Sequence, residues 1–343
     1  MATATEQPLR IAVLGVGRIG EMHAELVAHQ VPGASLASVA DAVPASAAAV
    51  GDRLGVPACS VDTVLDDPGV DAVAICTSTD THVDLVIAAA ASGKAIFCEK
   101  PLSLDLAEVD RGLAAVASAE VPLMIGFNRR FDPAHHAVHE AVAAGEIGDP
   151  HLVRITSRDP EPPPLAYILV SGGIFLDMTI HDFDMARFVT GSEVVEVYAQ
   201  GAVRVAASFA EAGDIDTAVV TLRHANGCLT AIDNSRQAVY GFDQRVEVFG
   251  SKGMAASENP FAYTSVVRTA EGTRNPTLPH FFRERYIPSY LLEWAAFVDA
   301  VRSGEEPSVT GADGRAPLVI GLAAWRSLRE HRPVAVAEID GGG

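Results

Sequence analysis

Short apolar runs alternate with helical patterns along the first third of the chain. The run that starts at Ile11, IAVLG, is followed by a glycine-rich turn and then by apolar residues at helical spacing. The apolar runs LASVAD, DAVAICT and KAIFCEK come next, separated by Ala-rich segments with helical periodicity. Strands that alternate with helices are typical of a parallel, doubly wound sheet. The pattern therefore predicts an N-terminal α/β domain.

The pattern changes after about residue 126. Proline and glycine interrupt the alternation, and β-rich runs then predominate at 152–156, 194–202, 217–224, 228–233 and 245–250. Two of these runs flank Asn226-Gly227, a dipeptide that favours a type I′ hairpin turn with two positive φ angles. Helical patterns at 291–304 and 314–330 close the chain. We expect one domain over residues 1–126 and an α+β domain over residues 127–343 with a large, mostly antiparallel open sheet.

Composition and charge exclude several classes of protein. A length of 343 residues with 49% hydrophobic and 20% charged residues suits two globular domains. The formal net charge of -19 opposes nucleic-acid binding, so no nucleic-acid partner is expected. Four scattered cysteines favour reduced thiols, and the first ten residues lack the apolar run of a signal peptide. A cytoplasmic protein without membrane spans is expected.

A glycine-rich motif follows the first predicted strand. Gly15, Gly17 and Gly20 form G-x-G-x-x-G, and Asp41 lies 21 residues beyond Gly20 at the end of the second predicted strand. In a dinucleotide-binding turn such glycines make the tight turn, admit the pyrophosphate and let the helix pack on the strand, while the acidic residue binds the ribose hydroxyls. Asp41 would repel a 2′-phosphate, so the motif predicts NAD rather than NADP. A turn without a nucleotide is the alternative, and Arg18 is either a solvated loop cation or a pyrophosphate contact.

Lysine is rare in this chain: among 25 lysines and arginines, only Lys94, Lys100 and Lys252 are lysines. Lys94 and Lys252 lie beside glycines in predicted turns. Lys100, in contrast, lies at the end of a predicted strand whose apolar sequence indicates burial. At the carboxyl end of a parallel strand a side chain reaches the ligand crevice. Burial can bring the pKa of a lysine into the working range, where it polarises or exchanges a proton with a substrate hydroxyl. Lys100 is therefore a candidate catalytic residue, and an exposed lysine at a strand end is the alternative.

A second polar cluster lies in the segment 171–188. Asp177, His181 and Asp184 have i, i+4 and i+7 spacing in a helical pattern, so one continuous helix would place them on one face. A histidine can take the proton from a reacting hydroxyl, and a carboxylate can stabilise the imidazolium that forms. We expect His181 to act as the base with Lys100 assisting, and no metal ion to be required. A capped helix start with a surface ion pair, or a metal site, are the alternatives.

These motifs resemble one enzyme family over essentially the whole chain, the glucose-fructose oxidoreductase and inositol dehydrogenase (Gfo/Idh/MocA) family. The glycine motif GVGRIG, the segment EKPLS and the Asp177 and His181 pair carry the resemblance. Longer blocks are similar to the myo-inositol 2-dehydrogenases of this family: NRRFD at 128–132, SRDPEPPP at 157–164, SGGIFLDMTIHDFDMARF at 171–188, YGFDQRVEVFGSKG at 240–253 and FFRERY at 281–286.

The resemblance implies a Rossmann domain, NAD as cofactor, oxidation of myo-inositol to 2-keto-myo-inositol in inositol catabolism, and a homotetramer formed through the open sheet. It also implies a cis peptide bond before Pro101. The implied catalytic residues are Lys100, Asp177 and His181. The implied cofactor contacts are Gly15, Gly17, Arg18, Ile19, Gly20, Asp41, Thr77, His82, Glu99 and Lys100. The implied polyol ligands are Arg130, Asp159, Asp184, Tyr240 and Tyr286.

The segment around Thr79 differs from the Pro-Asn turn of many relatives in this family. Two other functions are open. One is an NAD(P)-dependent dehydrogenase of another cyclic polyol or sugar, such as scyllo-inositol, D-chiro-inositol or an aldose, because stereochemistry depends on loop geometry. The other is a non-catalytic sugar or nucleotide sensor on the same fold, against which the three candidate catalytic residues argue.

Overall fold

The computed structural model describes residues 7–341. The chain divides into two compact units, the first formed by Met1–Phe127 with Tyr290–Arg315, and the second by Asn128–Ser289 with Ala316–Gly343. The first boundary therefore falls beside the expected one, whereas a later segment of the chain returns to the first unit. The residues 1–6, on which part of the expectation about targeting depends, lie outside the described residues.

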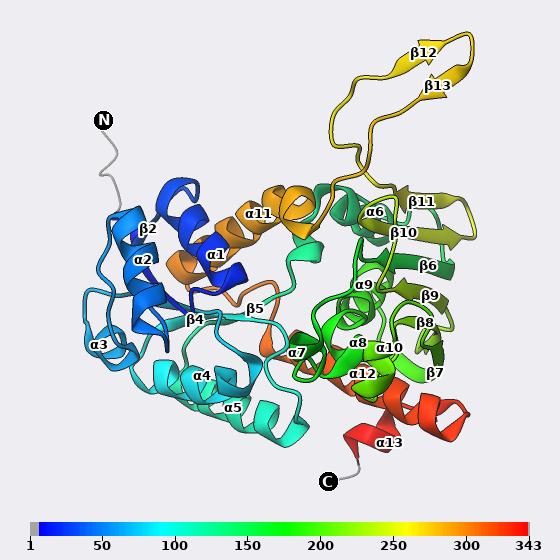
Figure 1. Ribbon diagram of the computed structural model, residues 1–343. Coiled ribbons are helices and arrows are strands. Elements are labelled where there is room, and N and C mark those ends of the chain that lie inside the picture. The colour runs from blue at the N-terminus through cyan, green and yellow to red at the C-terminus, as the bar shows by residue number, and fades with distance from the viewer. Residues whose placement is uncertain (1–6, 342–343) are drawn as a thin grey trace. The chain divides into compact units, whose positions relative to one another are not determined.

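The first unit contains a five-stranded sheet in the order β2-β1-β3-β4-β5, with all neighbouring strands parallel. Helices α1 and α11 lie on one face and α4 and α5 on the other (Figure 1). The strands β3, β4 and β5 are buried along their whole length, as expected when helices cover both faces. The strands are β1 (Leu9–Leu14), β2 (Ala34–Ala40), β3 (Ala72–Ile75), β4 (Ala95–Glu99) and β5 (Leu123–Gly126).

Local signals explain where several helices of this unit begin and end. The side chain of Asp105 accepts hydrogen bonds from two backbone N–H groups of the first turn of α5. Helix α2 starts at Pro44 and ends before Gly55, which has a left-handed conformation. The helices are α1 (Arg18–His29), α2 (Pro44–Leu54), α3 (Val61–Asp66), α4 (His82–Ala91) and α5 (Leu106–Ala119), with a 3-10 turn η1 (Thr79–Thr81).

The second unit is built on a seven-stranded sheet in the order β11-β10-β6-β9-β8-β7-β14. Only β6 and β9 pair in parallel, so the expected mostly antiparallel sheet is confirmed. Two further strands, β12 and β13, form an arm that projects from this unit (Figure 1). The strands are β6 (Pro150–Arg158), β7 (Val194–Ala202), β8 (Thr217–His224), β9 (Leu229–Ser235), β10 (Asp243–Gly250), β11 (Met254–Ser257), β12 (Val267–Thr269), β13 (Gly272–Arg274) and β14 (Val334–Ala335).

One face of the seven-stranded sheet carries the core of the second unit. Apolar side chains of the sheet pack there against apolar residues of the helices, which include Phe175, Phe183 and Ile320. None of the helices within residues 7–341 combines the length and apolarity needed to cross a membrane. The remaining elements are η2 (Asn128–Phe131), α6 (Pro133–Ala143), α7 (Leu165–Ile168), α8 (Gly173–Asp177), α9 (Ile180–Thr190), α10 (Ala207–Glu211), α11 (Phe282–Ser303), α12 (Gly311–Glu330) and α13 (Ala337–Asp340).

The hairpin around Asn226 forms, but its turn differs from the type I′ prediction. Strands β8 and β9 pair in antiparallel fashion up to Arg223 and Leu229. The only described non-glycine residues with positive φ are elsewhere in the chain, so Asn226 does not adopt a left-handed conformation, whereas Gly227 has φ 88°. The Gly227 N–H donates to the carbonyl of His224. The loop is thus a three-residue turn that ends in a left-handed glycine, the second common hairpin geometry.

Candidate active site

The glycine-rich loop lies at the carboxyl end of β1. Gly15 has φ 86°, and a Cβ there would lie 2.7 Å from the backbone of Thr77. A Cβ on Gly20 would lie 1.9 Å from the carbonyl oxygen of Gly15. Backbone packing alone therefore requires glycine at these two positions. The sheet order reverses beside β1, which is where doubly wound sheets bind their ligands.

Gly17 differs from Gly15 and Gly20, because packing within the protein does not require glycine at this position. It is the exposed N-cap residue of α1, and a Cβ built on it meets no atom within 4 Å. The protein itself leaves space beside this backbone, at the positive end of a twelve-residue helix. An approaching pyrophosphate fills such a space and accepts hydrogen bonds from the first turn of the helix. Arg18 and Ile19 form that first turn.

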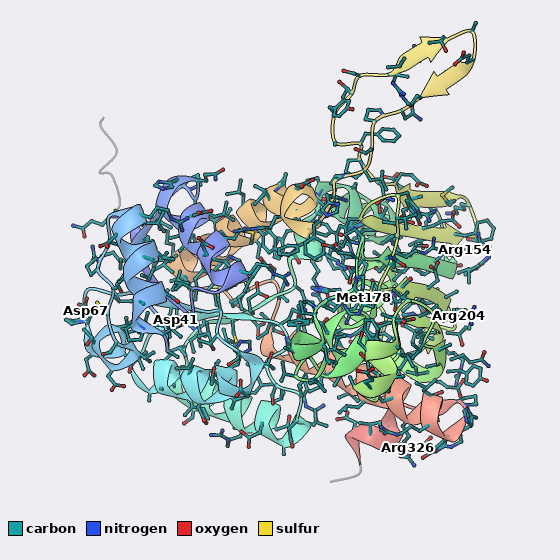
Figure 2. All side chains as sticks on the ribbon, viewed as in Figure 1. Asp41, Asp67, Arg154, Met178, Arg204 and Arg326 are labelled. Carbon is teal, nitrogen blue, oxygen red and sulfur yellow. The ribbon has the colours of Figure 1, made fainter. Side chains whose placement is uncertain are left out.

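Asp41 links the end of β2 to the glycine-rich loop (labelled in Figure 2). Its Oδ2 accepts a hydrogen bond from the Val16 N–H at 2.8 Å, and its Oδ1 accepts one from the Val43 N–H at 2.8 Å. The carboxylate is half-buried, so it keeps a face toward solvent. An acidic group in this position can accept the ribose hydroxyls of a dinucleotide, and no cation follows it to hold a 2′-phosphate.

The loops after β3 and β4 hold the remaining cofactor candidates. The hydroxyl groups of Thr77 and Thr81 lie 2.7 Å apart. His82 is buried, and its ring nitrogens lie 2.9 Å from the Pro101 carbonyl and 3.1 Å from the Thr77 carbonyl. Burial lowers the pKa of His82, although both carbonyls oppose this effect. The neutral ring can donate to one carbonyl at a time, and it braces the segment that follows Lys100.

Lys100 comes directly after β4, at the same edge of the sheet as the glycine-rich loop. It is half-buried, and its peptide bond to Pro101 is cis, as the resemblance implies. The Lys100 N–H donates to Oε2 of Glu99 at 3.2 Å. The first unit therefore brings together the glycine-rich loop, Glu99 and Lys100, while the other two catalytic candidates belong to the second unit.

The predicted single helix over the segment 171–188 is wrong. Helix α8 ends at Asp177 and α9 begins at Ile180, with Met178 (Figure 2) in the junction. The Thr179 N–H bonds to the carbonyl of Ile174, five residues back, so the regular hydrogen-bond ladder breaks. The Thr179 hydroxyl also lies 2.7 Å from Oδ1 of Asn234 on β9, which fixes the junction to the sheet.

Asp177 is held in the second unit by a residue that the sequence did not point to. Nη2 of Arg236 lies 2.7 Å from Asp177 Oδ2, and Nη1 lies 3.1 Å from Asp159 Oδ2. The Tyr167 hydroxyl donates to Asp177 Oδ1 at 2.7 Å. His181 is half-buried in the first turn of α9, after the junction. The buried guanidinium of Arg236 thus connects Asp177, a candidate catalytic residue, to Asp159, a candidate polyol-binding residue.

Burial and charge act against each other in this bridge. The side chain of Arg236 is only 5% exposed. Burial would lower the pKa of Arg236, but the Asp177 and Asp159 carboxylates outweigh it and raise that pKa. Burial raises the pKa of Asp159, which Arg236 opposes. No local motif marks Arg236, and its position after β9 becomes meaningful only once the fold is known.

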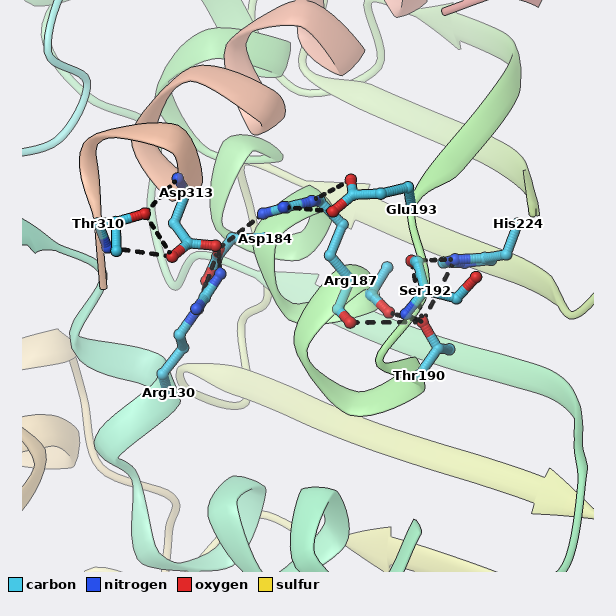
Figure 3. A network of polar contacts seen from close by, with 10 residues as sticks. Arg130, Asp184, Arg187, Thr190, Ser192, Glu193, His224, Thr310 and Asp313 are labelled. Carbon is cyan, nitrogen blue, oxygen red and sulfur yellow. Dashed lines mark hydrogen bonds and ion pairs between the residues drawn. The ribbon is translucent and has the colours of Figure 1, made fainter. Parts of the chain in front are cut away.

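Arg130 and Asp184, two candidate polyol-binding residues, form an ion pair with each other. Nε of Arg130 lies 2.9 Å from Asp184 Oδ2 and 3.1 Å from Oδ1, and both side chains are buried. Arg187 lies on the other side of Asp184, 4.0 Å away, and pairs with Glu193 at 2.7 Å (Figure 3). Asp184 therefore lies in a buried arginine cluster and does not share a continuous helical face with Asp177.

The two tyrosine candidates differ in environment. Tyr240 is 49% exposed, donates to Asp243 at 2.7 Å and accepts a hydrogen bond from Arg158 at 2.8 Å. Tyr286 is buried, and its hydroxyl lies 3.5 Å from Nε2 of His135. His135 is buried as well, on helix α6. Its Nδ1 also lies 2.7 Å from the Ser257 hydroxyl.

Comparisons with known proteins identify the family to which the chain is similar. Residues 9–127 match the family described as "Oxidoreductase family, NAD-binding Rossmann fold", and residues 135–256 match the "GFO/IDH/MocA C-terminal domain". The chain is 51% identical to the myo-inositol 2-dehydrogenase of Thermotoga maritima, over 97% of this chain and 100% of that protein. It is 39% identical to the NAD(+)-dependent scyllo-inositol 2-dehydrogenase of Bacillus subtilis, over 96% of each chain.

A solved structure gives the same result. The scyllo-inositol dehydrogenase of Lactobacillus casei, with bound NAD(H) and scyllo-inositol, has a TM-score of 0.88 and 29% identity, covering 96% of this chain and 100% of that one. A parallel sheet with a dinucleotide loop, followed by a mixed sheet with a polar cluster, defines an NAD-dependent oxidoreductase. The chain belongs to the Gfo/Idh/MocA oxidoreductase family.

Proposed function

We propose that this chain oxidises myo-inositol to 2-keto-myo-inositol with NAD. The observation that carries the proposal is the buried bridge from Asp177 through Arg236 to Asp159. It orients two carboxylates on one guanidinium, an arrangement suited to a ligand made of hydroxyl groups. The full-length similarity to a myo-inositol 2-dehydrogenase supports the choice of substrate.

The catalytic residues are proposed to be Lys100, Asp177 and His181, acting on one hydroxyl. His181 accepts the hydroxyl proton as the C–H bond breaks and the C=O bond forms. Asp177, held by Arg236 and Tyr167, stabilises the positive charge that develops on the imidazole. Lys100 donates a hydrogen bond to the reacting oxygen. Bound NAD supplies a nicotinamide ring that accepts the hydride with its two electrons.

The residues proposed to hold NAD lie at the carboxyl edge of the five-stranded sheet. The space beside Gly17 receives the pyrophosphate, and Asp41 accepts the ribose hydroxyls. The full set comprises Gly15, Gly17, Arg18, Ile19, Gly20, Asp41, Thr77, His82, Glu99 and Lys100. The residues proposed to bind the polyol are Arg130, Asp159, Asp184, Tyr240 and Tyr286. Arg130 and Asp184 also form an ion pair with each other.

A homotetramer in the cytoplasm is proposed for the assembled enzyme. The outer face of the seven-stranded sheet supports this assembly, because Leu229, Leu152, Phe249 and Met254 lie opposite one another on four neighbouring strands. Of these, Leu229, Phe249 and Met254 are about half exposed. An apolar row of this kind is typical of a surface that another subunit covers. Sedimentation velocity tests the tetramer directly.

Initial rates of NADH formation test the proposed substrate. We expect myo-inositol to give a higher kcat/KM than scyllo-inositol, D-chiro-inositol or glucose, and NAD to be preferred to NADP by at least tenfold because of Asp41. A faster reaction with another polyol or with an aldose would replace the proposed substrate. If none of these compounds is oxidised, the alternative of a non-catalytic sensor is favoured.

The substitution Lys100→Met separates an enzyme from a sensor. We expect kcat to fall by about 1,000-fold, consistent with the usual contribution of acid–base groups, while the Kd for NADH changes by less than threefold. Lys252→Met, in the turn before β11, is the matched control and leaves kcat unchanged. Equal activity of the Lys100→Met variant and the wild type would contradict the mechanism.

A further inference from the structure

His23 lies buried inside the first unit, although it belongs to the first helix after the glycine-rich loop. Its Nδ1 accepts a hydrogen bond from Nε1 of Trp294 at 2.9 Å, and its Nε2 lies 2.9 Å from Oε1 of Glu99. These residues come from α1, α11 and β4, respectively. Neither the glycine motif nor the EKPLS segment explains why a histidine should be fixed here.

The chemistry of the partners defines the tautomer of His23. An indole N–H is only a donor, so Nδ1 of His23 carries a lone pair rather than a hydrogen. The remaining nitrogen, Nε2, therefore carries the hydrogen and donates it to the Glu99 carboxylate. The hydrogen bonds run in one direction, from Trp294 through His23 to Glu99.

Glu99 in turn contacts the backbone of the catalytic candidate. Its Oε2 accepts a hydrogen bond from the Lys100 N–H at 3.2 Å, while Oε1 faces His23. A Cβ on Gly126 of the neighbouring strand would lie 3.2–3.3 Å from the Glu99 carboxyl group. Glycine at that position leaves the space that the carboxylate occupies. The Glu99 side chain is only 10% exposed, so its carboxylate is almost completely shielded from solvent.

The surroundings of His23 restrict its ring. Phe97, Tyr290 and Trp294 approach it edge-on with ring centroids 5.3, 5.4 and 5.6 Å away. Trp294 also stacks on Phe97 with centroids 4.6 Å apart. Such apolar walls exclude water, which strengthens the hydrogen bonds inside and prevents the imidazole from rotating.

A second buried carboxyl group completes the cluster. Glu293 is fully buried, and burial raises its pKa, to which the charge of nearby Glu99 adds. Two buried carboxyl groups that repel each other do not both ionise readily. Of the two, Glu99 is the one whose carboxylate oxygens each accept a hydrogen bond, from His23 and from the Lys100 N–H. The raised pKa favours the neutral form of Glu293.

We propose that Trp294 and His23 are positioning residues for Lys100, acting through the oriented carboxylate of Glu99. The proposal rests on the proposed function insofar as Lys100 acts in the dehydrogenation. Neither residue touches the substrate. The relay fixes the carboxylate, and the carboxylate fixes the backbone from which the Lys100 side chain extends.

The first test replaces the donor to Glu99. His23→Leu removes it, and we expect kcat to fall at least tenfold with an increased primary deuterium isotope effect, because hydride transfer becomes slower. His23→Gln places an amide N–H near the position of Nε2 and should restore kcat to within about threefold of the wild type. His29→Leu, an exposed histidine at the end of the same helix, is the control.

Binding of ADP to the same variants, measured by calorimetry, shows whether the dinucleotide loop is intact. A Kd within twofold of the wild type in both His23 variants is expected, because ADP lacks the nicotinamide half. Equal kcat values in His23→Leu and His23→Gln would overturn the relay. So would a parallel loss of ADP binding and kcat, since that pattern indicates general damage. An inactive wild-type enzyme would instead refute the proposed function.

The second test needs no substrate. Nitrogen-15 NMR of the histidine side chains in the wild-type protein should show a neutral ring for His23 with hydrogen on Nε2. Trp294→Phe keeps the aromatic packing but removes the indole donor, and we expect the signal to shift toward a mixture of tautomers. Hydrogen on Nδ1 in the wild type, or an unchanged spectrum in Trp294→Phe, would contradict the proposal.

Discussion

Arg236 and Asp177 form a buried ion pair, with Nη2 2.7 Å from Oδ2. The same guanidinium reaches Asp159, so one cation balances two buried carboxylates. Removal of one partner from such a cluster leaves the others desolvated and without compensation. We therefore expect the bridge both to stabilise the second unit and to orient Asp177, the proposed catalytic aspartate.

Arg236→Met should damage activity more than any surface change of the same type. We expect kcat/KM for the polyol to fall about 100-fold or more, and the free energy of unfolding to fall by roughly 3 kcal/mol. Arg223→Met is a matched control, because Arg223 forms an exposed pair with Glu196 on the neighbouring strand. Steady-state kinetics and urea unfolding measure both quantities, and equal behaviour of the two variants would contradict the assigned role.

Two glycines of one motif should respond differently to alanine. Gly20→Ala introduces a Cβ 1.9 Å from the Gly15 carbonyl, and overpacking of this kind costs about 1–3 kcal/mol of stability. Gly17→Ala meets open space and should leave stability within about 0.5 kcal/mol of the wild type. The Kd for NADH should nevertheless rise at least tenfold in Gly17→Ala, because the methyl group occupies the pyrophosphate position. Thermal unfolding together with NADH fluorescence separates the two effects.

His135 makes folding sensitive to mild acid. Burial lowers its pKa to about 4, against an ordinary value of about 6.5, although Asp132 opposes the shift. Between these values the unfolded chain binds a proton that the folded chain does not. Stability attributable to this group is therefore present above pH 6.5 and is lost as the pH falls toward 4, at up to about 1.4 kcal/mol per pH unit.

Urea unfolding at pH 7 and pH 5 tests this effect. His135→Gln should lose less stability than the wild type on going from pH 7 to pH 5, while His151→Gln at an exposed position should match the wild type. An identical pH dependence of the wild type and His135→Gln would mean that His135 is not the responsible group.

The fold was predictable where its signals are local. Apolar runs of four to nine residues and their alternation with helical segments are properties of the nearby chain. They predicted β1 to β4 of the first sheet and β6 to β10 of the second, but not β5, β11 or β14. The turn at Gly227 was predicted with the wrong geometry, because the position of Asn-Gly within the turn depends on which residues of the flanking strands pair. The helix break at Thr179 depends on Asn234, which lies far along the chain.

The candidate site divides in the same way. The glycine motif and Asp41 are recognisable because their function requires fixed spacing along one strand, turn and helix. Arg236 and Trp294 have no such spacing. Their partners, Asp177 and His23, are 59 and 271 residues away in the sequence. Long-range partners of this kind become identifiable only when the fold places them together.

The return of Tyr290–Arg315 to the first unit has a consequence for the newly made protein. The ribosome must synthesise all of Asn128–Ser289 before this segment appears, which takes roughly 10–30 s at about 5–20 residues per second. During that interval Phe97 lacks the indole of Trp294 that stacks on it in the finished fold. The nascent nucleotide-binding unit thus stays incomplete while Asn128–Ser289 is synthesised. An exchange of this unit between two enzymes therefore requires two separate segments of the coding sequence.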